Sequence, residues 1–357
     1  MLLEFGLPFI LGTGLLLAAV GCAMQQKPKV STSAPRYPAA TTGLALGRGV
    51  NLGNALEAPR EGEWGVVLQE EYFDLIRNAG FDAVRIPIRW SAHALPTEPY
   101  TVDPAFFRRV DWAVEQALAR GLRAVINMHH YEELVADPAG QRARFLALWR
   151  QIADHYRPYP ADLLFELLNE PNGKLDADAW NDLLVAGLAV VRETNPTRAI
   201  IIGPANWNGI DALPRLKLPA DDRHIIATVH YYNPFHFTHQ GAEWVQGSDR
   251  WLGAQWQGSD AERAAVAQDL GRAAAWATAN DRPLYLGEFG AYSKADMASR
   301  VRWTNYVARQ AESLGMSWAY WEFCAGFGIY DPARRAWNED LLRALVPPVQ
   351  ESRGRQQ

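Results

Sequence analysis

The sequence is poor in cysteine, since its 357 residues include only Cys22 and Cys324. Cys22 falls in an N-terminal leader-like segment, so once the leader is removed no disulfide can form within a domain. Stability must therefore come from a hydrophobic core. Hydrophobic residues make up 48% of the chain, which is enough for one large α/β barrel or two smaller domains.

The sequence also lacks a strong charge of either sign and lacks a nucleotide-binding fingerprint. The net charge of −5 is spread along the chain, so no basic surface for nucleic acid is expected. No G-x-G-x-x-G follows the first expected strand, which argues against a dinucleotide-binding fold. The histidines show neither H-x-H nor H-E-x-x-H spacing, so no metal site and no cofactor are expected.

Long apolar runs are scarce, and the clearest one lies at the N-terminus. Residues 7–20 are too few for a typical membrane span of about 20 residues. The run ends at small residues and Cys22, which resembles a bacterial signal peptide with a lipoprotein-type cleavage site, although Ala19 stands where leucine is usual and Glu4 where a basic residue is usual. We expect a secreted, periplasmic or membrane-anchored protein, with Cys22 as the candidate site of a lipid anchor.

The remaining chain divides into segments of different composition. Residues 25–42 are rich in proline, serine, threonine and alanine, which is typical of a flexible tether. The expected organisation is a signal peptide at 1–22, a flexible linker at 23–43, one catalytic domain at 44–346 and a disordered tail at 347–357.

From residue 48 onward, short apolar runs alternate with amphipathic stretches. The expected strands are residues 49–53, 83–88, 124–128, 163–168, 199–203, 225–231, 284–287 and 318–322. The expected helices are residues 68–79, 104–120, 141–156, 177–193, 260–279 and 295–314. Gly80, Gly121 and Gly315 follow three of these helices and suit a left-handed C-cap. Eight repeats without a compositional break predict a (β/α)8 TIM barrel as a single domain, with its fifth and eighth helices least marked.

Polar residues follow the expected strands, and two of them are glutamates. Glu170 follows a strand in LLFELLNEP, and Glu288 follows another in PLYLGEFG. Strand ends of a barrel face one mouth, where active sites lie. Two carboxyl groups at one mouth suit the cleavage of a glycosidic bond, which needs a proton donor and either a nucleophile or a base.

The neighbours of the two glutamates suggest different roles for them. Apolar surroundings and a nearby carboxylate would keep Glu170 protonated, whereas Arg85 would keep Glu288 ionised and Tyr232 could position it. The chain also has 14 Trp and 13 Tyr, and flat aromatic faces suit pyranose rings. The other residues expected to contact sugar are His129, His130, Asn169, His230, Trp321, Asn54, Trp64 and Trp207.

Seven segments in order resemble glycoside hydrolase family 5, the former cellulase family A. They are RGVNLGNALEAP, AVRIPIRW, INMHHYEEL, LLNEP, TVHYYNP, LGEFG and WAYWEF. The resemblance implies Glu170 as acid/base, Glu288 as nucleophile and retention of anomeric configuration. It also implies that Arg85, one or both of His129 and His130, and Asn169, His230, Tyr232 and Trp321 form the −1 subsite, with Asn54, Glu57, Trp64, Tyr131, Glu133, Trp207 and the loop 235–259 shaping the cleft.

The resemblance implies an endo-β-1,4-glucanase whose partner is a β-glucan polysaccharide or oligosaccharide. A β-mannanase or a broad-specificity β-glucanase of the same family is the alternative. A metal-dependent hydrolase and a catalytically inactive sugar-binding barrel are two further hypotheses. The first conflicts with Arg85 at the mouth, and the second with the presence of both glutamates. We expect the protein to be a monomer.

Overall fold

The computed structural model describes residues 44–348. The expectations for the signal peptide, for the linker and for nearly all of the C-terminal tail lie outside the described residues. None of the helices within residues 44–348 combines the length and the apolar character that a membrane crossing requires.

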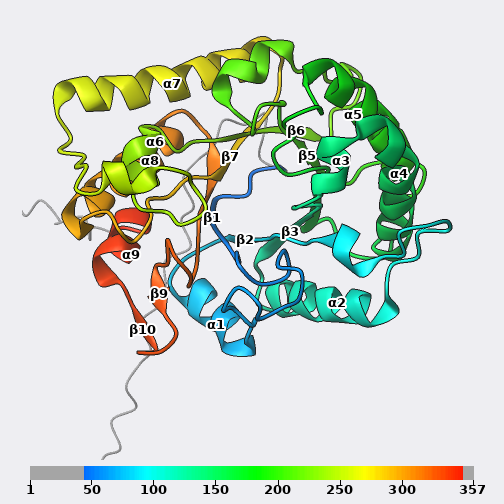
Figure 1. Ribbon diagram of the computed structural model, residues 1–357, viewed down its shortest axis with the longest axis horizontal. Helices are drawn as coiled ribbons and strands as arrows, with labels where there is room; N and C mark the ends of the chain where they lie inside the picture. Colours follow the sequence, from blue (N-terminus) through cyan, green and yellow to red (C-terminus); the bar gives the residue numbers. More distant parts are fainter. Residues whose placement is uncertain (1–43, 349–357) are drawn as a thin grey trace, which may run out of the picture. The chain divides into compact units, whose positions relative to one another are not determined.

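Eight parallel strands close into a barrel in sequence order, which confirms the predicted (β/α)8 TIM barrel. Figure 1 shows the strands at the centre with the helices arranged around them. The strands are β1 Arg48–Asn51, β2 Ala83–Ile86, β3 Arg123–Asn127, β4 Leu163–Glu166, β5 Ile200–Ile202, β6 Ile225–His230, β7 Leu284–Glu288 and β8 Ser317–Tyr320. β8 pairs with β1 and closes the sheet.

Most strands are followed by a helix that covers the outside of the barrel. The helices are α1 Glu70–Asn78, α2 Pro104–Ala119, α3 Glu132–Ala136, α4 Pro138–His155, α5 Ala177–Arg192, α6 Phe235–Thr238, α7 Asp260–Ala279, α8 Met297–Ser313 and α9 Glu339–Leu345. After β5 the chain forms only the 3₁₀ helix Ile210–Arg215 (η3), because Pro214 interrupts the segment and removes a backbone donor. The sequence accordingly shows only a weak helical pattern after the fifth strand, where the structure has no α-helix before β6.

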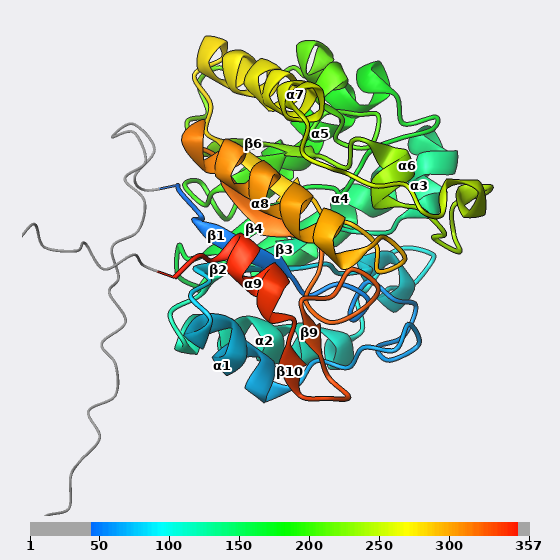
Figure 2. The ribbon, with the colours of Figure 1, turned by 90° about the vertical axis from the view of Figure 1, so that its left-hand side faces the viewer.

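The eighth unit has a small addition before its helix. A two-stranded hairpin, β9 Tyr330–Asp331 and β10 Ala336–Trp337, lies between β8 and α9. Figure 2 shows α9 between α8 and α1, where it completes the ring of helices.

The barrel interior changes from apolar to polar along the strands. Ala83, Val125, Leu164 and Tyr285 pack together as part of one inner apolar cluster. Two residues further along the strands, side chains on the same inner face are polar, because strand side chains alternate between two faces. This polar layer, which lies toward the carboxyl ends of the strands, contains Asn51, Arg85, Asn127 and Glu166. The polar floor of the barrel is therefore a direct result of strand sequence.

Local sequence explains where the helices begin and end. Ser259 and Glu262 form a reciprocal capping box at the start of α7, which satisfies two free backbone donors. Gly80, Gly121 and Gly315 have φ values of 96°, 69° and 73°. These values agree with the predicted left-handed C-caps.

Two glycine-to-alanine substitutions should change stability in opposite directions. Gly121 has φ +69°, whereas Gly271 lies inside α7, and an added Cβ meets no atom within 4 Å at either site. We expect Gly121→Ala to lower the free energy of unfolding by about 1 kcal/mol through backbone strain. Gly271→Ala should raise it by about 0.5–1 kcal/mol through helix propensity. Denaturant midpoints would measure both, and shifts of the same sign would contradict the argument.

Candidate active site

A large cavity lies at the carboxyl ends of the strands. Its volume is about 1350 Å³. Its lining comes from loops on opposite sides of the barrel, since Asn54 and Trp64 follow β1 while Trp207 and Asp211 follow β5. The cavity therefore runs across the mouth of the barrel, as a groove for a polymer would.

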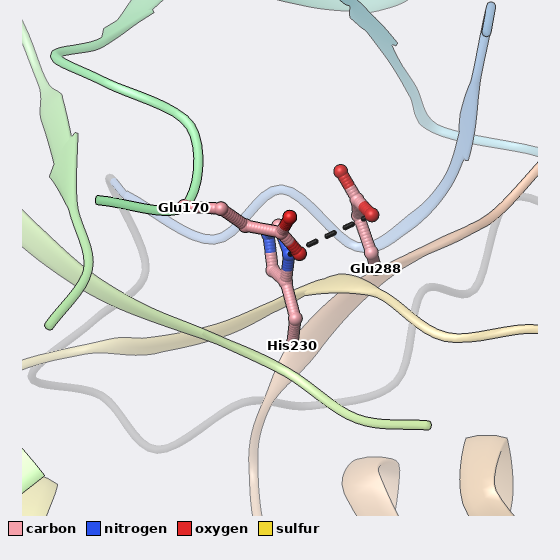
Figure 3. Close-up of side chains that lie close together, drawn as sticks. All are labelled: Glu170, His230 and Glu288. Atoms are coloured by element: carbon pink, nitrogen blue, oxygen red, sulfur yellow. Dashed lines mark hydrogen bonds and ion pairs between the residues drawn. The ribbon is translucent and has the colours of Figure 1, made fainter. Parts of the chain in front are cut away.

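Glu170 and Glu288 meet in this cavity with His230 beside them. Nδ1 of His230 lies 2.7 Å from Oε1 of Glu170 and 3.6 Å from Oε2 of Glu288. One oxygen of each carboxyl group and a ring nitrogen of His230 all lie within 4.8 Å of one another. Figure 3 shows the imidazole pointing toward the two carboxyl groups.

A shift in strand register brings Glu288 to face His230. Val229 of β6 pairs with Leu286 of β7, but the next residue, His230, pairs with Glu288 and leaves Gly287 unmatched. Such irregularities redirect side chains next to active sites. A Cβ on Gly287 would lie 3.0 Å from Nε2 of His230, so the missing side chain leaves room for the ring.

Glu170 is held by unusual backbone geometry. Its φ is 46°, in the left-handed region that costs a non-glycine residue about 1–2 kcal/mol. Such strain often occurs at functional sites. The residue is followed by Pro171, and Asn172 donates a hydrogen bond from Nδ2 to the backbone carbonyl of Glu170 at 2.8 Å.

Arg85 lies beneath the cavity and does not reach it. The side chain is completely buried and does not line the cavity, so it lies one layer below the position expected for a residue that contacts sugar. Its Nη1 donates to Oε1 of Glu288 at 2.7 Å and to Asn51 at 2.8 Å, and its Nη2 donates to Oδ1 of Asn169 at 2.7 Å. Arg85 orients the residues above it.

The main partner of Arg85 is Glu166, which the sequence analysis did not select. Arg85 donates to both carboxylate oxygens of Glu166, at 2.5 Å and 2.8 Å, and a paired geometry of this kind is the strongest that arginine forms with a carboxylate. Glu166 is a carboxylate inside an otherwise apolar strand. That position was the signal that could have identified it.

Burial has the largest influence on the pKa of both glutamates. It raises the pKa of Glu170 from its usual 4.5 to about 7, and the charge of Glu166 adds to the increase while that of Arg85 opposes it. Burial also raises the pKa of Glu288, against the opposing influence of His230 and Arg85. Arg85 thus favours the ionised form of Glu288, as expected, but it does not outweigh burial.

The three histidines occupy different depths. His230 is almost completely buried, and burial lowers its pKa to about 4, so its ring is neutral near pH 7. His129 is also buried and stacks on Trp321, with ring centroids 5.7 Å apart. His130 lies nearer the rim, edge-on to Trp64 at 5.4 Å. Both alternatives, His129 and His130, line the cavity.

Tyr232, Asn169 and Trp321 also line the cavity. The hydroxyl of Tyr232 donates to Oε2 of Glu288 at 2.9 Å, which places it where the sequence suggested. The side-chain oxygen Oδ1 of Asn169 accepts a hydrogen bond from Arg85. Trp321 follows β8 and presents its ring beside His129.

The outer residues expected to shape the groove divide into two sets. Asn54, Glu57, Trp64 and Trp207 line the cavity. Tyr131 and Glu133 are outside the lining, and the hydroxyl of Tyr131 instead donates to Gln141 of α4 at 2.8 Å. Tyr131 is buried, whereas Glu133 in the first turn of α3 is exposed.

The loop 235–259 contributes one tryptophan to the cavity. Trp244 lines the groove and is 61% exposed, whereas Trp256 is buried against Tyr306. Sequence reasoning did not distinguish them, because both follow the same strand. It also missed Tyr292 and Phe327, which line the groove near Trp244 together with His239 of the same loop.

Comparison with known proteins agrees with this geometry. Residues 46–326 match the family model described as cellulase (glycosyl hydrolase family 5). The chain belongs to glycoside hydrolase family 5. This membership confirms the family to which the seven sequence segments pointed.

Individual relatives within family 5 are similar over most of this chain. Endoglucanase H of Acetivibrio thermocellus is 37% identical over 85% of the chain, which spans 33% of that relative. Cel5A of Thermotoga maritima in complex with mannotriose is 54% identical with a TM-score of 0.83, covering 85% of this chain and 98% of Cel5A. Cel5A in complex with cellobiose is 55% identical with the same TM-score and coverage.

The residues of this family 5 member also bear on whether a metal could bind. Glu170, His230 and Glu288 are close enough together to hold a cation. The guanidinium of Arg85 already donates to Glu288 at 2.7 Å, and its positive charge disfavours a second cation there. The donor set therefore suits proton transfer better than metal binding.

Replacing Glu166 tests how much its ion pair with Arg85 stabilises this family 5 barrel. We expect Glu166→Gln to lower the free energy of unfolding by about 3 kcal/mol, because it leaves the charge of Arg85 buried without its paired carboxylate. Denaturant unfolding would measure the loss. Glu312→Gln is the control, since Glu312 pairs with Arg48 at 2.8 Å but both side chains remain partly exposed. Equal losses in the two variants would contradict the role of Glu166.

Proposed function

We propose that the protein is a retaining endo-β-1,4-glucanase that cleaves internal bonds in cellulose or related β-glucans by double displacement. The observation that carries this proposal is the short distance between Glu170 and Glu288, whose nearest oxygens lie within 4.8 Å. Retaining enzymes hold their carboxyl groups about 5–5.5 Å apart, while inverting enzymes need about 6.5–9.5 Å to admit a water molecule.

In the first step, a carboxylate oxygen of Glu288 attacks the anomeric carbon, and the bond to the leaving oxygen breaks. Glu170 transfers its proton to that oxygen, so the departing chain leaves as an alcohol. In the second step, Glu170 accepts a proton from water, and the water oxygen displaces Glu288 from the anomeric carbon. The cycle ends with Glu288 ionised and Glu170 protonated, as at the start.

The surroundings fit these two roles. A pKa of about 7 lets Glu170 give and take a proton near neutral pH. Arg85 and Tyr232 each donate a hydrogen bond to Glu288, which stabilises the carboxylate as nucleophile and as leaving group. Asn169 would bind a sugar hydroxyl, and Trp321 would stack on the sugar at the point of cleavage.

The groove supports an endo-acting enzyme. It crosses the mouth between the loops after β1 and β5, and exposed Trp64, Trp207 and Trp244 lie along it. Related Cel5A was solved with cellobiose and with mannotriose, so both glucan and mannan belong among the substrates tested. We also propose that the protein acts outside the cytoplasm, where such polymers occur, and the expected leader at residues 1–22 supports this.

The first test measures substrate and stereochemistry together. We expect the protein to hydrolyse carboxymethyl-cellulose and barley glucan, with rapid loss of viscosity because internal bonds break. Proton NMR of the first products should show the β-anomer. An initial α-anomer would contradict the double displacement, and activity restricted to glucomannan or mannan would favour the alternative β-mannanase. Activity on glucan and mannan alike would favour a broad-specificity enzyme.

The second test concerns Glu170. We expect Glu170→Ala to lower kcat about 10²–10⁴-fold on cellobiosides with poor leaving groups, because protonation contributes most there. Cellobiosides with acidic phenols should lose much less activity. In the unmodified protein, kcat/KM should fall as pH rises above about 7, and this fall should disappear in Glu170→Ala. A uniform loss on all leaving groups would contradict the acid role.

A further inference from the structure

The loop after β5 has an unusual backbone and close ties to the acid/base residue. Asn206, Trp207 and Asn208 have φ values of 60°, 57° and 54°, so three consecutive residues are left-handed. The amide of Trp207 donates to the carbonyl of Pro171 at 3.2 Å, and the amide of His230 donates to the carbonyl of Asn208 at 3.0 Å. The loop is thus fixed to the residue after Glu170 and to His230.

The side chain of Asn208 is completely buried and lies against the far side of the His230 ring. Its Nδ2 is 3.3 Å from Nε2 of His230, while Nδ1 of the same ring is 2.7 Å from Oε1 of Glu170. Within residues 44–348, the amide of Asn208 is the one hydrogen-bonding partner of Nε2. The three side chains form a line that ends at the acid/base carboxyl group.

The surroundings determine which ring nitrogen carries the proton. Nδ1 faces oxygens of Glu170 and Glu288, so a proton on Nδ1 is attracted and a lone pair there would be repelled. Nε2 must then be an acceptor, which matches an N–H donated by Asn208. In a neutral histidine, the hydrogen bond at one nitrogen sets the protonation of the other.

Several charged or titratable groups face this line from other elements. They are Arg85 of β2, Glu166 of β4, Glu288 of β7, His129 after β3 and Tyr232 after β6. Arg85 and Glu166 influence the pKa of Glu170, and together with Glu288 they influence the pKa of His230. None of the five groups bonds to Nε2. Gly287 packs against Nε2 and offers no side chain. Among the described residues, Asn208 is therefore the side chain that bonds to Nε2, while the two carboxyl groups act on Nδ1.

We propose that Asn208 is a positioning residue that holds His230 in the Nδ1–H tautomer, so that His230 binds Oε1 of Glu170 and leaves Oε2 to exchange the catalytic proton. This inference rests on the proposed acid/base role of Glu170. The bond from Nδ1–H fixes the orientation of the carboxyl group in both steps. It also stabilises the carboxylate form, which opposes the effect of burial.

Two variants would test the tautomer. Asn208→Gly removes the amide and tolerates the left-handed backbone. Asn208→Asp keeps the shape and the tolerance for positive φ, but an ionised carboxylate only accepts, so it should draw the proton to Nε2. The matched control is Asn206→Gly, because Asn206 has a similar φ on the same loop and an exposed side chain.

The first measurement is ¹⁵N–¹H NMR of ¹⁵N-histidine-labelled protein, with His230 assigned by its loss in His230→Gln. We expect Nδ1–H in the unmodified protein and in Asn206→Gly, and Nε2–H as the dominant form in Asn208→Asp. In Asn208→Gly the carboxyl groups still attract the proton to Nδ1, so Nε2–H should appear there as an additional form beside Nδ1–H. A merely structural role of Asn208 would leave the tautomer unchanged. Nε2–H in the unmodified protein, or Nδ1–H alone in both Asn208 variants, would overturn the proposal.

The second measurement is the pH profile of kcat/KM on a cellobioside with a poor leaving group. We expect Asn208→Gly to move the fall at high pH upward by about one unit, as loss of a hydrogen bond to a carboxylate implies, and to lower kcat about tenfold with little change in KM. An unchanged profile would overturn the effect on Glu170. If the unmodified protein hydrolysed no β-glucan, the proposed function would fail while the NMR result still decided the tautomer.

Discussion

The buried guanidinium of Arg85 is the interaction on which the site depends. A cation with no solvent exposure is costly unless every charge and donor is matched. Here it is matched by Glu166, Glu288, Asn51 and Asn169, which lie on or directly after β1, β4 and β7. The side chain of Arg85 on β2 therefore connects four strands of the barrel. Its hydrogen bonds fix the position and orientation of the residues above it.

The electrostatic balance of the site follows from this arrangement. Arg85 opposes the rise in pKa that burial imposes on Glu170 and Glu288. The negative charge of Glu166 limits this effect, because it neutralises much of the guanidinium. Glu170 is therefore left with a pKa of about 7, which is suited to both directions of proton transfer. The floor of the barrel tunes the chemistry at its mouth without touching the substrate groove.

The sequence predicted the barrel and most of the groove because both depend on periodic patterns. Apolar runs mark the strands, and polar residues at their ends share one mouth, so Glu170, Glu288, His230 and Tyr232 were expected near one another. The burial of Arg85 was not apparent, since the same pattern fits a residue at the mouth or one layer below it. Glu166 was missed because attention went to the residues after each strand, whereas Glu166 lies inside its strand.

Other features depend on contacts between distant segments. The register shift that directs Glu288 inward becomes visible only when β6 and β7 are paired. Likewise, Trp244 and Trp256 belong to one loop, and packing against residues distant in sequence such as Tyr306 buries Trp256 while Trp244 stays exposed. The contact between Asn208 and His230 joins residues 22 positions apart, and no local pattern predicts it.

The division between a strand-built floor and a loop-built groove has a consequence for protein engineering. Arg85, Glu166 and Glu288 are rooted in the sheet, whereas Trp64, Trp207 and Trp244 are carried by the loops after β1, β5 and β6. Under the proposed function, loops from other barrels could therefore be grafted onto this scaffold to change polymer preference while the two glutamates keep their support. The loop after β5 is the exception, because exchanging it would also disturb the support of His230.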